Sequence, residues 1–228
     1  MTDSHIAIFC DFDGTVSKRD IGYQLYRHFS GGRNDALLPD WKAGKLSTRN
    51  CLEMEAAMVR ASPEEIFSFL DQFELDDTFI EFEQVCRANS IPLMIVSEGL
   101  DFYIKRLLLA HGLDDLPVYC NIGHLENGGL RMEFPYPVRT CDGCGNCKAA
   151  RIAEYRRTVS NSGQVIFIGD GYSDACGANE ADIVFAKKDL VRYCRDEGIS
   201  YHRFSNFNDV TSRLLQIGLL TSNAKPKI

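Results

Sequence analysis

Four short segments of the chain carry the side chains that phosphoryl transfer through a carboxylate requires. They are Asp11-Phe12-Asp13-Gly14-Thr15, Ser97-Glu98-Gly99, Lys148 and Gly169-Asp170-Gly171-Tyr172-Ser173-Asp174. An aspartate can attack a phosphoryl group and form an aspartyl-phosphate, which divides one difficult displacement into two easier ones. We predict that Asp11 is this nucleophile. Asp13, two residues on, would protonate the leaving alcohol and then deprotonate the attacking water.

The other segments supply groups that handle the charge of a phosphate. The hydroxyl of Ser97 and the backbone N–H groups beside it can hold a phosphoryl oxygen. Lys148 supplies a positive charge that offsets the repulsion between the phosphate and the nucleophile. Asp170 can complete a Mg²⁺ site with Asp11 and one phosphate oxygen, and Asp174 could hold Asp170 or a metal-bound water. Each segment alone is common, but the four together predict a magnesium-dependent phosphatase.

Three of these segments follow short apolar runs of the kind that form buried strands. The runs are Ile6 to Cys10, Ile91 to Val96 and Val165 to Ile168. Predicted helices at 100–111, 146–157 and 189–197 alternate with strands at 118–120 and 183–185, and a hairpin is expected at 126–129. The pattern predicts an α/β fold, a doubly wound Rossmann-like parallel sheet, with the polar segments at the carboxyl ends of the strands, where such sheets bind ligands.

A long insertion with helical signals separates the first strand from the second. Helices are predicted at 21–29, 47–60 and 62–73, and the last has a clear start: Ser62 as N-cap, Pro63 at the first helical position and Glu65 three residues after the cap. We predict a helical cap domain over residues 17–85, which closes over the substrate and excludes water. Residues 1–16 and 86–228 would form the Rossmann-like core.

The chain resembles the haloacid dehalogenase superfamily of Mg²⁺-dependent phosphatases. Its motifs are matched, in chain order, by Asp11, Asp13 and Thr15 (DxDxT), Ser97, Lys148, and Asp170 with Asp174 (GDxxxD). The resemblance implies that the backbone carbonyl of Asp13 also binds Mg²⁺. The implied metal site therefore consists of Asp11, Asp13, Asp170 and Asp174.

Further stretches are similar to the phosphoserine phosphatase-like branch of this superfamily. They are Ser97 to Tyr103, Tyr119 to Asn121, Cys144 to Lys148 and Phe185-Ala186. They look most like the family of methionine-salvage phosphatases that act on 2-hydroxy-3-keto-5-methylthiopentenyl-1-phosphate. The resemblance implies a small phosphorylated metabolite as substrate, with phosphoserine, phosphocholine and phosphoethanolamine as alternatives.

Five residues are expected to contact the substrate. Thr15, Glu98 and Gly99 belong to the motifs, and Tyr172 borders the pocket by its position in the fourth motif. Asp20 lies where the family often contacts polar groups of the substrate, although it could instead only cap the helix that follows. Glu98 departs from the Ser-Gly-Gly sequence of the branch. In the pocket it would repel an anionic substrate tail, but we expect it to face solvent because most glutamates are exposed.

The nine cysteines raise a separate question. A CxxCxxC triplet could give three ligands to a zinc ion, and three other residues could supply a fourth. The triplet is Cys141, Cys144 and Cys147, and the candidates for the fourth ligand are Cys120, His124 and Cys176. The simpler interpretation is a tight thiol-rich loop that positions Lys148, since a second CxxC or CxxH pair is missing. We favour that interpretation over zinc binding.

Composition limits the partners of the protein. A formal net charge of −7 over 228 residues argues against nonspecific binding to nucleic acid or to an anionic membrane. The sequence shows no membrane-spanning stretch and no basic signal-peptide region. We therefore expect a cytoplasmic monomer or homodimer whose partner is a small phosphorylated metabolite. Two other classes are a phospho-acceptor signalling domain, which has no use for the leaving-group acid Asp13, and a zinc-binding interaction protein on a phosphatase scaffold.

Overall fold

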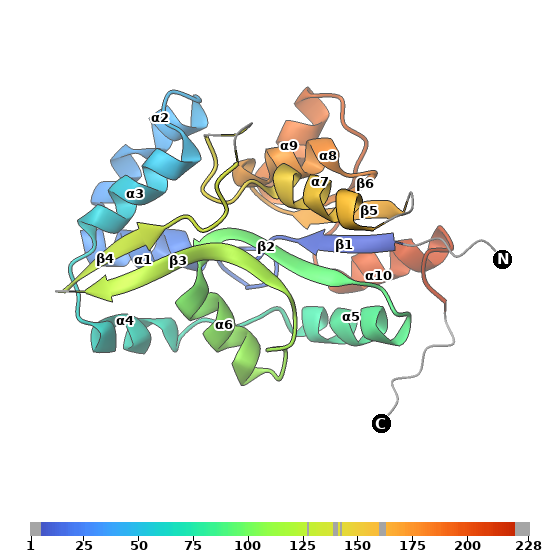
Figure 1. Ribbon diagram of the computed structural model, residues 1–228, viewed down its shortest axis with the longest axis horizontal. Coiled ribbons are helices and arrows are strands. Elements are labelled where there is room, and N and C mark those ends of the chain that lie inside the picture. The colour runs from blue at the N-terminus through green and yellow to red at the C-terminus, as the bar shows by residue number, and fades with distance from the viewer. Residues whose placement is uncertain (1–5, 127, 139–140, 142, 160–162, 222–228) are drawn as a thin grey trace.

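A seven-stranded sheet runs through the centre of the computed structural model (Figure 1). The structure describes residues 6–126, 128–138, 141, 143–159 and 163–221. The strands lie in the order β4-β3-β2-β1-β5-β6-β7, and every neighbouring pair is parallel except β3 and β4. Their bounds are β1 Ile6–Cys10, β2 Leu93–Leu100, β3 Val118–Glu126, β4 Gly129–Glu133, β5 Gln164–Gly169, β6 Ile183–Ala186 and β7 His202–Arg203. The predicted doubly wound α/β fold is confirmed.

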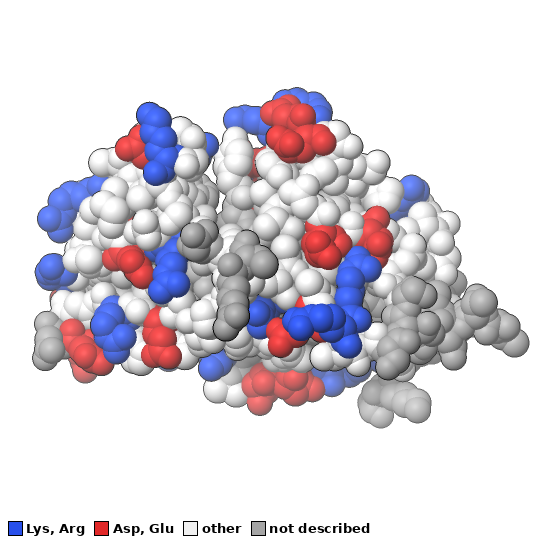
Figure 2. Space-filling model, turned by 45° about the horizontal axis from the view of Figure 1, so that its top comes forward, with Lys and Arg blue, Asp and Glu red and all other residues white. Residues whose placement is uncertain are grey.

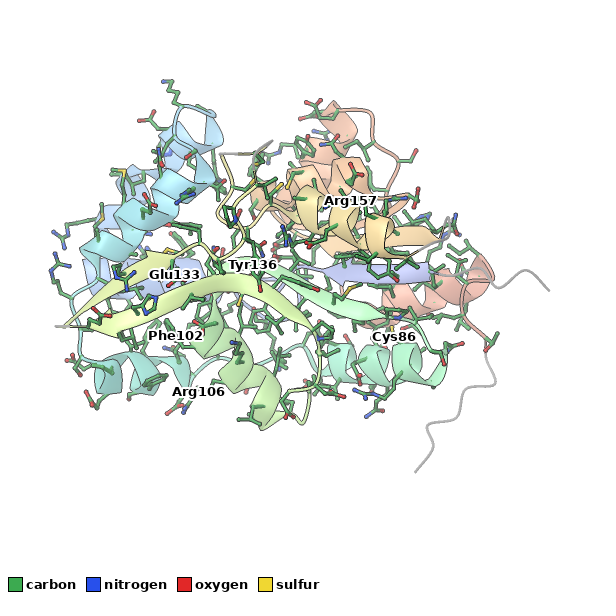
Figure 3. All side chains as sticks on the ribbon, in the orientation of Figure 1. Cys86, Phe102, Arg106, Glu133, Tyr136 and Arg157 are labelled. Carbon is green, nitrogen blue, oxygen red and sulfur yellow. The ribbon has the colours of Figure 1, made fainter. Side chains whose placement is uncertain are left out.

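Two layers of helices cover the sheet, because alternate side chains of a strand point to opposite faces. Ile8 of β1 belongs to an apolar cluster with residues of α5 (Asp77–Ala88), α6 (Asp101–Ala110) and α10 (Phe207–Gln216). Phe9 belongs to a second cluster, with α7 (Lys148–Thr158), α8 (Ala175–Glu180) and α9 (Lys188–Asp196). Figure 3 shows Cys86 of α5 and Phe102 of α6 on one side of the sheet and Arg157 of α7 on the other.

Four further helices and a 3-10 turn lie between β1 and α5. They are α1 Ile21–Ser30, η1 Arg33–Ala36, α2 Leu38–Lys42, α3 Thr48–Met58 and α4 Pro63–Leu70. The predicted start of α4 is confirmed: Ser62 Oγ accepts a hydrogen bond from the Glu65 backbone N–H, and the Glu65 carboxylate accepts one from the Ser62 backbone N–H. α1 ends at Gly31, whose φ of 64° lies in the left-handed region that glycine adopts without strain.

The chain leaves the sheet and returns to it along neighbouring backbone segments. The Lys18 backbone N–H donates to the Glu74 carbonyl, and the Asp76 backbone N–H donates to the Val16 carbonyl. α5 begins just after this return, and its Phe79 packs against Phe207 of α10 with ring centroids 5.0 Å apart. The division of the chain into a core and a helical cap stays a proposal. The contacts favour a cap that ends near residue 76, ahead of α5, rather than at 85.

The hairpin of β3 and β4 runs between α3, above it in Figure 1, and α4, below it. Glu126 pairs with Gly129 across its turn, as predicted for 126–129, while Asn127 lies outside the described residues. Helix α3 packs against β4, so the insertion rests partly on the sheet. The Tyr26 hydroxyl of α1 donates to the Met132 sulfur of β4 at 3.5 Å.

Charged residues of both signs are interspersed on the molecular surface. On the face shown in Figure 2, Lys and Arg side chains lie among Asp and Glu side chains. Within the described part of the chain, no helix has both the length and the apolar composition needed to cross a bilayer.

Candidate active site

Three adjacent strands bring the predicted catalytic residues together. Asp11 follows β1, Ser97 lies in the last half of β2, and Asp170 follows β5, and these strands are neighbours in the order β2-β1-β5. All three residues line a pocket of about 440 Å³. Successive strands are added on one side of β1 up to β4 and on its other side from β5 to β7. Doubly wound sheets bind ligands beside such a central strand, and the pocket lies there. Helices α1, α2 and α3 supply its other wall.

Lys148 joins two buried carboxylates at the base of the site. Its ammonium group donates to Asp11 Oδ1 at 2.6 Å and also to Asp174 Oδ1, and the lysine is 1% exposed. Burial alone would lower the pKa of Lys148, but the two carboxylates raise it well above its ordinary value, so the lysine stays charged. Burial and the Asp174 carboxylate raise the pKa of Asp11. The nucleophile therefore needs more positive charge than one lysine supplies.

Asp13 is held by donors from two different parts of the chain. Its Oδ1 accepts hydrogen bonds from the backbone N–H groups of Ile21 (2.9 Å) and Gly22 (3.2 Å), and its Oδ2 accepts one from the Tyr103 hydroxyl (2.6 Å). Burial and the nearby Asp20 carboxylate raise the pKa of Asp13 to about 7, while these donors oppose the rise. A carboxyl group with a pKa near neutrality can both give and take a proton, as a general acid and base must.

Asp170 faces a lysine that the sequence did not reveal. The Lys188 ammonium donates to Asp170 Oδ2 at 2.7 Å and to the Gly14 carbonyl at 3.1 Å. Lys188 also has a φ of 48°, which is uncommon outside glycine. A cation already lies between a carboxylate and a backbone carbonyl, the two kinds of oxygen that Mg²⁺ prefers.

The acidic cluster fits a divalent cation. Carboxylate oxygens of Asp11, Asp170 and Asp174 all lie within 4.8 Å of one another. Burial, followed by the Asp174 charge, raises the pKa of Asp170 to about 6. Both oxygens of Asp174 are engaged: Oδ1 binds Lys148, and Oδ2 accepts from the backbone N–H groups of Asp170 (2.8 Å) and Gly171 (2.9 Å). Asp11 and Asp170 are therefore the better ligands, with Asp174 orienting Asp170.

Ser97 and Gly99 form one compact turn next to Asp13. The Gly99 backbone N–H donates to Ser97 Oγ at 2.9 Å, and Ser97 Oγ lies 3.4 Å from Asp13 Oδ2. A Cβ atom on Gly99 would overlap the Tyr103 hydroxyl and the Asp13 carboxylate, so the position has no room for a side chain. The close approach of this backbone leaves the serine hydroxyl facing the pocket.

Glu98 does not face solvent, and that expectation was wrong. It is 9% exposed, and its carboxylate accepts hydrogen bonds from the backbone N–H groups of Gly145 (3.2 Å) and Asn146 (2.8 Å). Asn121 donates to the Glu98 backbone carbonyl at 2.7 Å. Burial raises the pKa of Glu98 to about 7. The glutamate also borders the pocket, but its carboxylate binds the loop that precedes Lys148.

The other predicted substrate contacts divide into two groups. Asp20 and Tyr172 line the pocket, and Asp20 also caps α1 by accepting from the Tyr23 backbone N–H at 2.8 Å; contact of either residue with the substrate stays a prediction. Thr15 is a correction: it is fully buried and does not line the pocket. Its backbone N–H donates to the Phe12 carbonyl, and this turn carries the side chain away from the pocket.

The wall of the pocket near α2 and α3 combines aromatic, apolar and acidic side chains. Trp41 of α2 meets Tyr172 of the fourth motif edge to face, with ring centroids 6.3 Å apart. Leu52 and Glu55 of α3 also line the pocket. Glu55 is 5% exposed, and its carboxylate accepts a hydrogen bond from the Asn34 side chain at 3.0 Å. The sequence shows a glutamate at position 55, but it does not show that this side chain is buried at the pocket.

Comparison with known proteins identifies the family. A family model for haloacid dehalogenase-like hydrolases matches residues 8–178. The chain is 30% identical to the 2-hydroxy-3-keto-5-methylthiopentenyl-1-phosphate phosphatase of Brevibacillus brevis over 219 residues, covering 93% of this chain and 96% of that protein. It is also 30% identical to the enzyme of the same name from Geobacillus thermodenitrificans, over 94% of this chain and 98% of that one.

Solved structures show the same fold at lower identity. A phospho-aspartyl intermediate analogue of phosphoserine phosphatase superposes with a TM-score of 0.71 at 15% identity, covering 92% of this chain and 98% of that one. A phosphoserine phosphohydrolase-like protein from Francisella tularensis superposes with a TM-score of 0.67 at 18% identity, covering 91% and 99%. The fold and the site thus define a Rossmann-like hydrolase of the haloacid dehalogenase type.

The chain belongs to the haloacid dehalogenase-like hydrolase family. Within it, the protein is a phosphatase, an enzyme of the phosphoric monoester hydrolase class. The two non-catalytic classes considered from the sequence are therefore set aside.

Proposed function

We propose that the protein is a Mg²⁺-dependent phosphomonoesterase that works through an aspartyl-phosphate on Asp11. The observation that carries this proposal is the pairing of Asp11 with Lys148 at 2.6 Å, beside an Asp13 whose pKa is about 7. An oxygen of Asp11 forms a bond to phosphorus while the ester P–O bond breaks, and Asp13 gives its proton to the departing oxygen. Asp13 then takes a proton from water, whose oxygen displaces Asp11 and yields inorganic phosphate.

The neighbours of Asp11 stabilise the charge that the phosphoryl group brings. The Ser97 hydroxyl, which lines the pocket, would donate to a phosphoryl oxygen. Lys148 remains charged next to Asp11 and reduces its repulsion from the phosphate. Asp11 and Asp170 would hold Mg²⁺ together with the Asp13 backbone carbonyl that the family resemblance implies. When bound, the metal supplies the positive charge that the buried carboxylates lack.

The favoured substrate is 2-hydroxy-3-keto-5-methylthiopentenyl-1-phosphate, the substrate named for the relatives that match most of the chain. Its methylthio end is apolar, and Leu38, Trp41 and Leu52 offer apolar surface on the cap side of the pocket. A pocket of about 440 Å³ suits a metabolite of this size. Caps of this kind would also exclude water from the transfer step.

An amino-alcohol phosphate, such as phosphoethanolamine or phosphocholine, is the second candidate. Two carboxyl groups, those of the buried Glu55 and of Asp20, the N-cap residue of α1, line the pocket together with Tyr23 and Trp41. Carboxylates and aromatic faces are the groups that bind ammonium ions. A cationic substrate would therefore depend on the Glu55 carboxyl for binding, whereas the methylthiopentenyl phosphate would not.

The chemistry is tested by phosphate release from a panel of phosphorylated metabolites, with and without Mg²⁺. The panel contains the methylthiopentenyl phosphate, phosphoserine, phosphocholine, phosphoethanolamine and pyridoxal phosphate. Wild type should release phosphate only with Mg²⁺, and Asp11→Asn should be inactive but folded. An active Asp11→Asn variant would rule out the aspartyl-phosphate. Asp13→Asn should still accept phosphate from an activated substrate, and mass spectrometry of the protein would detect the adduct.

The substrate class is tested by Glu55→Gln, with Glu53→Gln on the exposed face of α3 as its matched control. If the natural substrate is cationic, Glu55→Gln should raise KM for that substrate at least about tenfold, because it loses a charge pair. If the substrate is the methylthiopentenyl phosphate, KM should change little. Glu53→Gln should leave KM for either compound unchanged.

The surroundings of the enzyme also remain proposals. None of the nine cysteines, all of which the structure describes, forms a disulfide, which favours a reducing compartment such as the cytoplasm. Sedimentation of the purified protein would decide between the two expected states, a monomer and a homodimer.

A further inference from the structure

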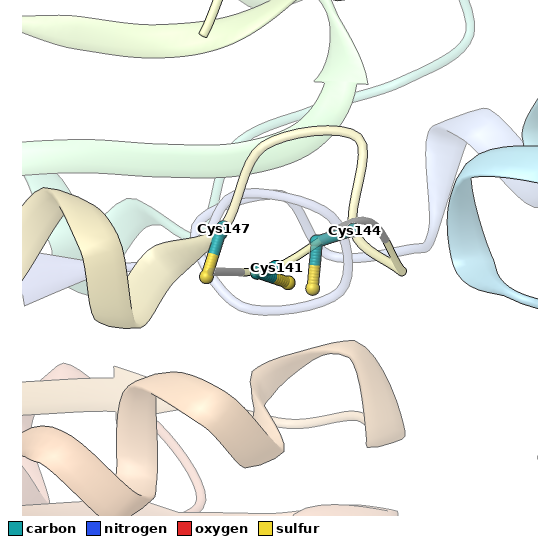
Figure 4. A group of neighbouring side chains, drawn as sticks. All are labelled: Cys141, Cys144 and Cys147. Carbon is teal, nitrogen blue, oxygen red and sulfur yellow. The ribbon is translucent and has the colours of Figure 1, made fainter. Parts of the chain in front are cut away.

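Three cysteines gather in the loop that leads into α7. Sulfur atoms of Cys141, Cys144 and Cys147 all lie within 4.8 Å of one another. Figure 4 shows the three sulfur atoms pointing to the same side of the loop. In a tetrahedral zinc site with Zn–S bonds of about 2.3 Å, the sulfurs lie about 3.8 Å apart. The loop therefore already holds the triplet close to the spacing that one ion needs.

A fourth sulfur approaches the triplet from another part of the chain. Helix α8 packs against α7, and Cys176 in the first turn of α8 has Cys144 and Cys147 as side-chain neighbours, although its sulfur does not belong to the group that lies within 4.8 Å of one another. The other two candidates for a fourth ligand are engaged elsewhere. Cys120 is 5% exposed and packs in the apolar core, and His124 pairs with Glu133 at 2.8 Å. The structure thus selects Cys176 from the three.

We propose that Cys141, Cys144, Cys147 and Cys176 bind one Zn²⁺ ion tetrahedrally, as a structural centre separate from the magnesium site. Four thiolates around one position are the donor set of closed structural zinc sites. Each thiol loses its proton to the solvent as its sulfur binds, so no oxidant or reductant is needed. The missing second CxxC pair is no obstacle, because the fold supplies Cys176.

The zinc ion would fix the lysine that binds the nucleophile. Cys147 is the N-cap residue of α7, and Lys148 is the first residue of that helix. Cys176 follows Asp174, the second carboxylate partner of Lys148, by two residues. An ion shared by the loop and α8 therefore ties together the two chain segments that position the Lys148 ammonium group. This role deepens the proposed function, whereas zinc binding itself does not depend on it.

Metal content of the full chain is the first test. Protein purified under reducing conditions without added zinc should contain close to one zinc per chain, as measured by elemental mass spectrometry. After removal of the zinc, Co²⁺ should give the sulfur-to-metal charge-transfer and intense d–d absorption of a tetrahedral thiolate site. A zinc content below about one tenth per chain with no cobalt absorption would overturn the proposal, and so would iron in place of zinc.

Single substitutions identify the ligands. Cys144→Ser and Cys176→Ser should each lose bound zinc and the cobalt absorption. The control is Cys194→Ala, a buried thiol of α9 outside the cluster, which should keep one zinc per chain. Retention of zinc by Cys176→Ser would refute the fourth ligand. A failure of the phosphatase assignment would leave these metal readings unchanged, so the two proposals can fail separately.

Discussion

If Asp13 is the general acid of the proposed mechanism, its hydrogen bond from Tyr103 should set the pH at which the enzyme works. Tyr103→Phe removes a donor that lies 2.6 Å from Asp13 Oδ2, in a position where the tyrosine is fully buried. A hydrogen bond to a charged group contributes about 1.5–3 kcal/mol, and one pKa unit corresponds to about 1.4 kcal/mol. The donor stabilises the ionised form, so its loss should raise the pKa of Asp13 by about one to two units above its value of about 7.

The assay is the pH dependence of kcat/KM for phosphate release. The first step needs protonated Asp13, so the alkaline limb of the profile should move upward by about one to two pH units in Tyr103→Phe. Tyr26→Phe is the matched control, because the Tyr26 hydroxyl of the same pocket donates to the Met132 sulfur and not to a carboxylate. An unchanged alkaline limb in Tyr103→Phe, or an equal shift in Tyr26→Phe, would refute the assignment of Asp13 as the general acid.

Three further predictions concern other parts of the site. Gly99→Ala should lower kcat about 100-fold in steady-state kinetics, because the new Cβ overlaps the Asp13 carboxylate. Gly143→Ala is its control, because a Cβ at that position meets open space and kcat should stay unchanged. Lys148→Met should lower kcat/KM at least about 100-fold in the same assay, since two buried carboxylates lose their shared cation. Burial raises the Glu55 pKa from 4.5 to about 7, so the folded protein holds a proton that the unfolded chain releases, and stability should fall by about 3 kcal/mol as pH rises through this range. Glu55→Gln should make the fall smaller by about this amount in thermal unfolding experiments, and Glu53→Gln should leave it unchanged; Asp13 and Glu98, whose pKa values are also about 7, keep the remainder.

Local signals were sufficient to predict many of the elements. The start of α4 depends on contacts among residues 62–65, and the strands before Asp11 and Asp170 are continuous apolar runs. α10 was not predicted, although its signals are local: Asn206 caps it, and its buried residues Phe207, Val210 and Leu214 repeat at helical spacing. Strand order depends on contacts between distant segments and could not be derived from periodicity.

Some residues of the site could likewise be predicted from local sequence, and others could not. Asp11, Asp13 and Asp170 were predictable because each follows a strand and its position in the fold is fixed by that strand. Lys188 was missed because its role depends on a contact with Asp170, which the sequence does not show. Glu98 was expected in solvent from the general preference of glutamate. Its burial depends on two backbone N–H donors from a loop 47 and 48 residues away.

Helix α1 begins on the group that moves the catalytic proton. Asp13 Oδ1 accepts hydrogen bonds from the first two backbone N–H groups of the helix, at Ile21 and Gly22. A carboxylate accepts more strongly than a carboxylic acid, so α1 is anchored most firmly after Asp13 has given up its proton. In the proposed mechanism, that is the interval in which the phosphoryl group is on Asp11. Recovery of the proton from water would then weaken the two hydrogen bonds at the start of α1, so the firmness of this helix start would follow the progress of the reaction.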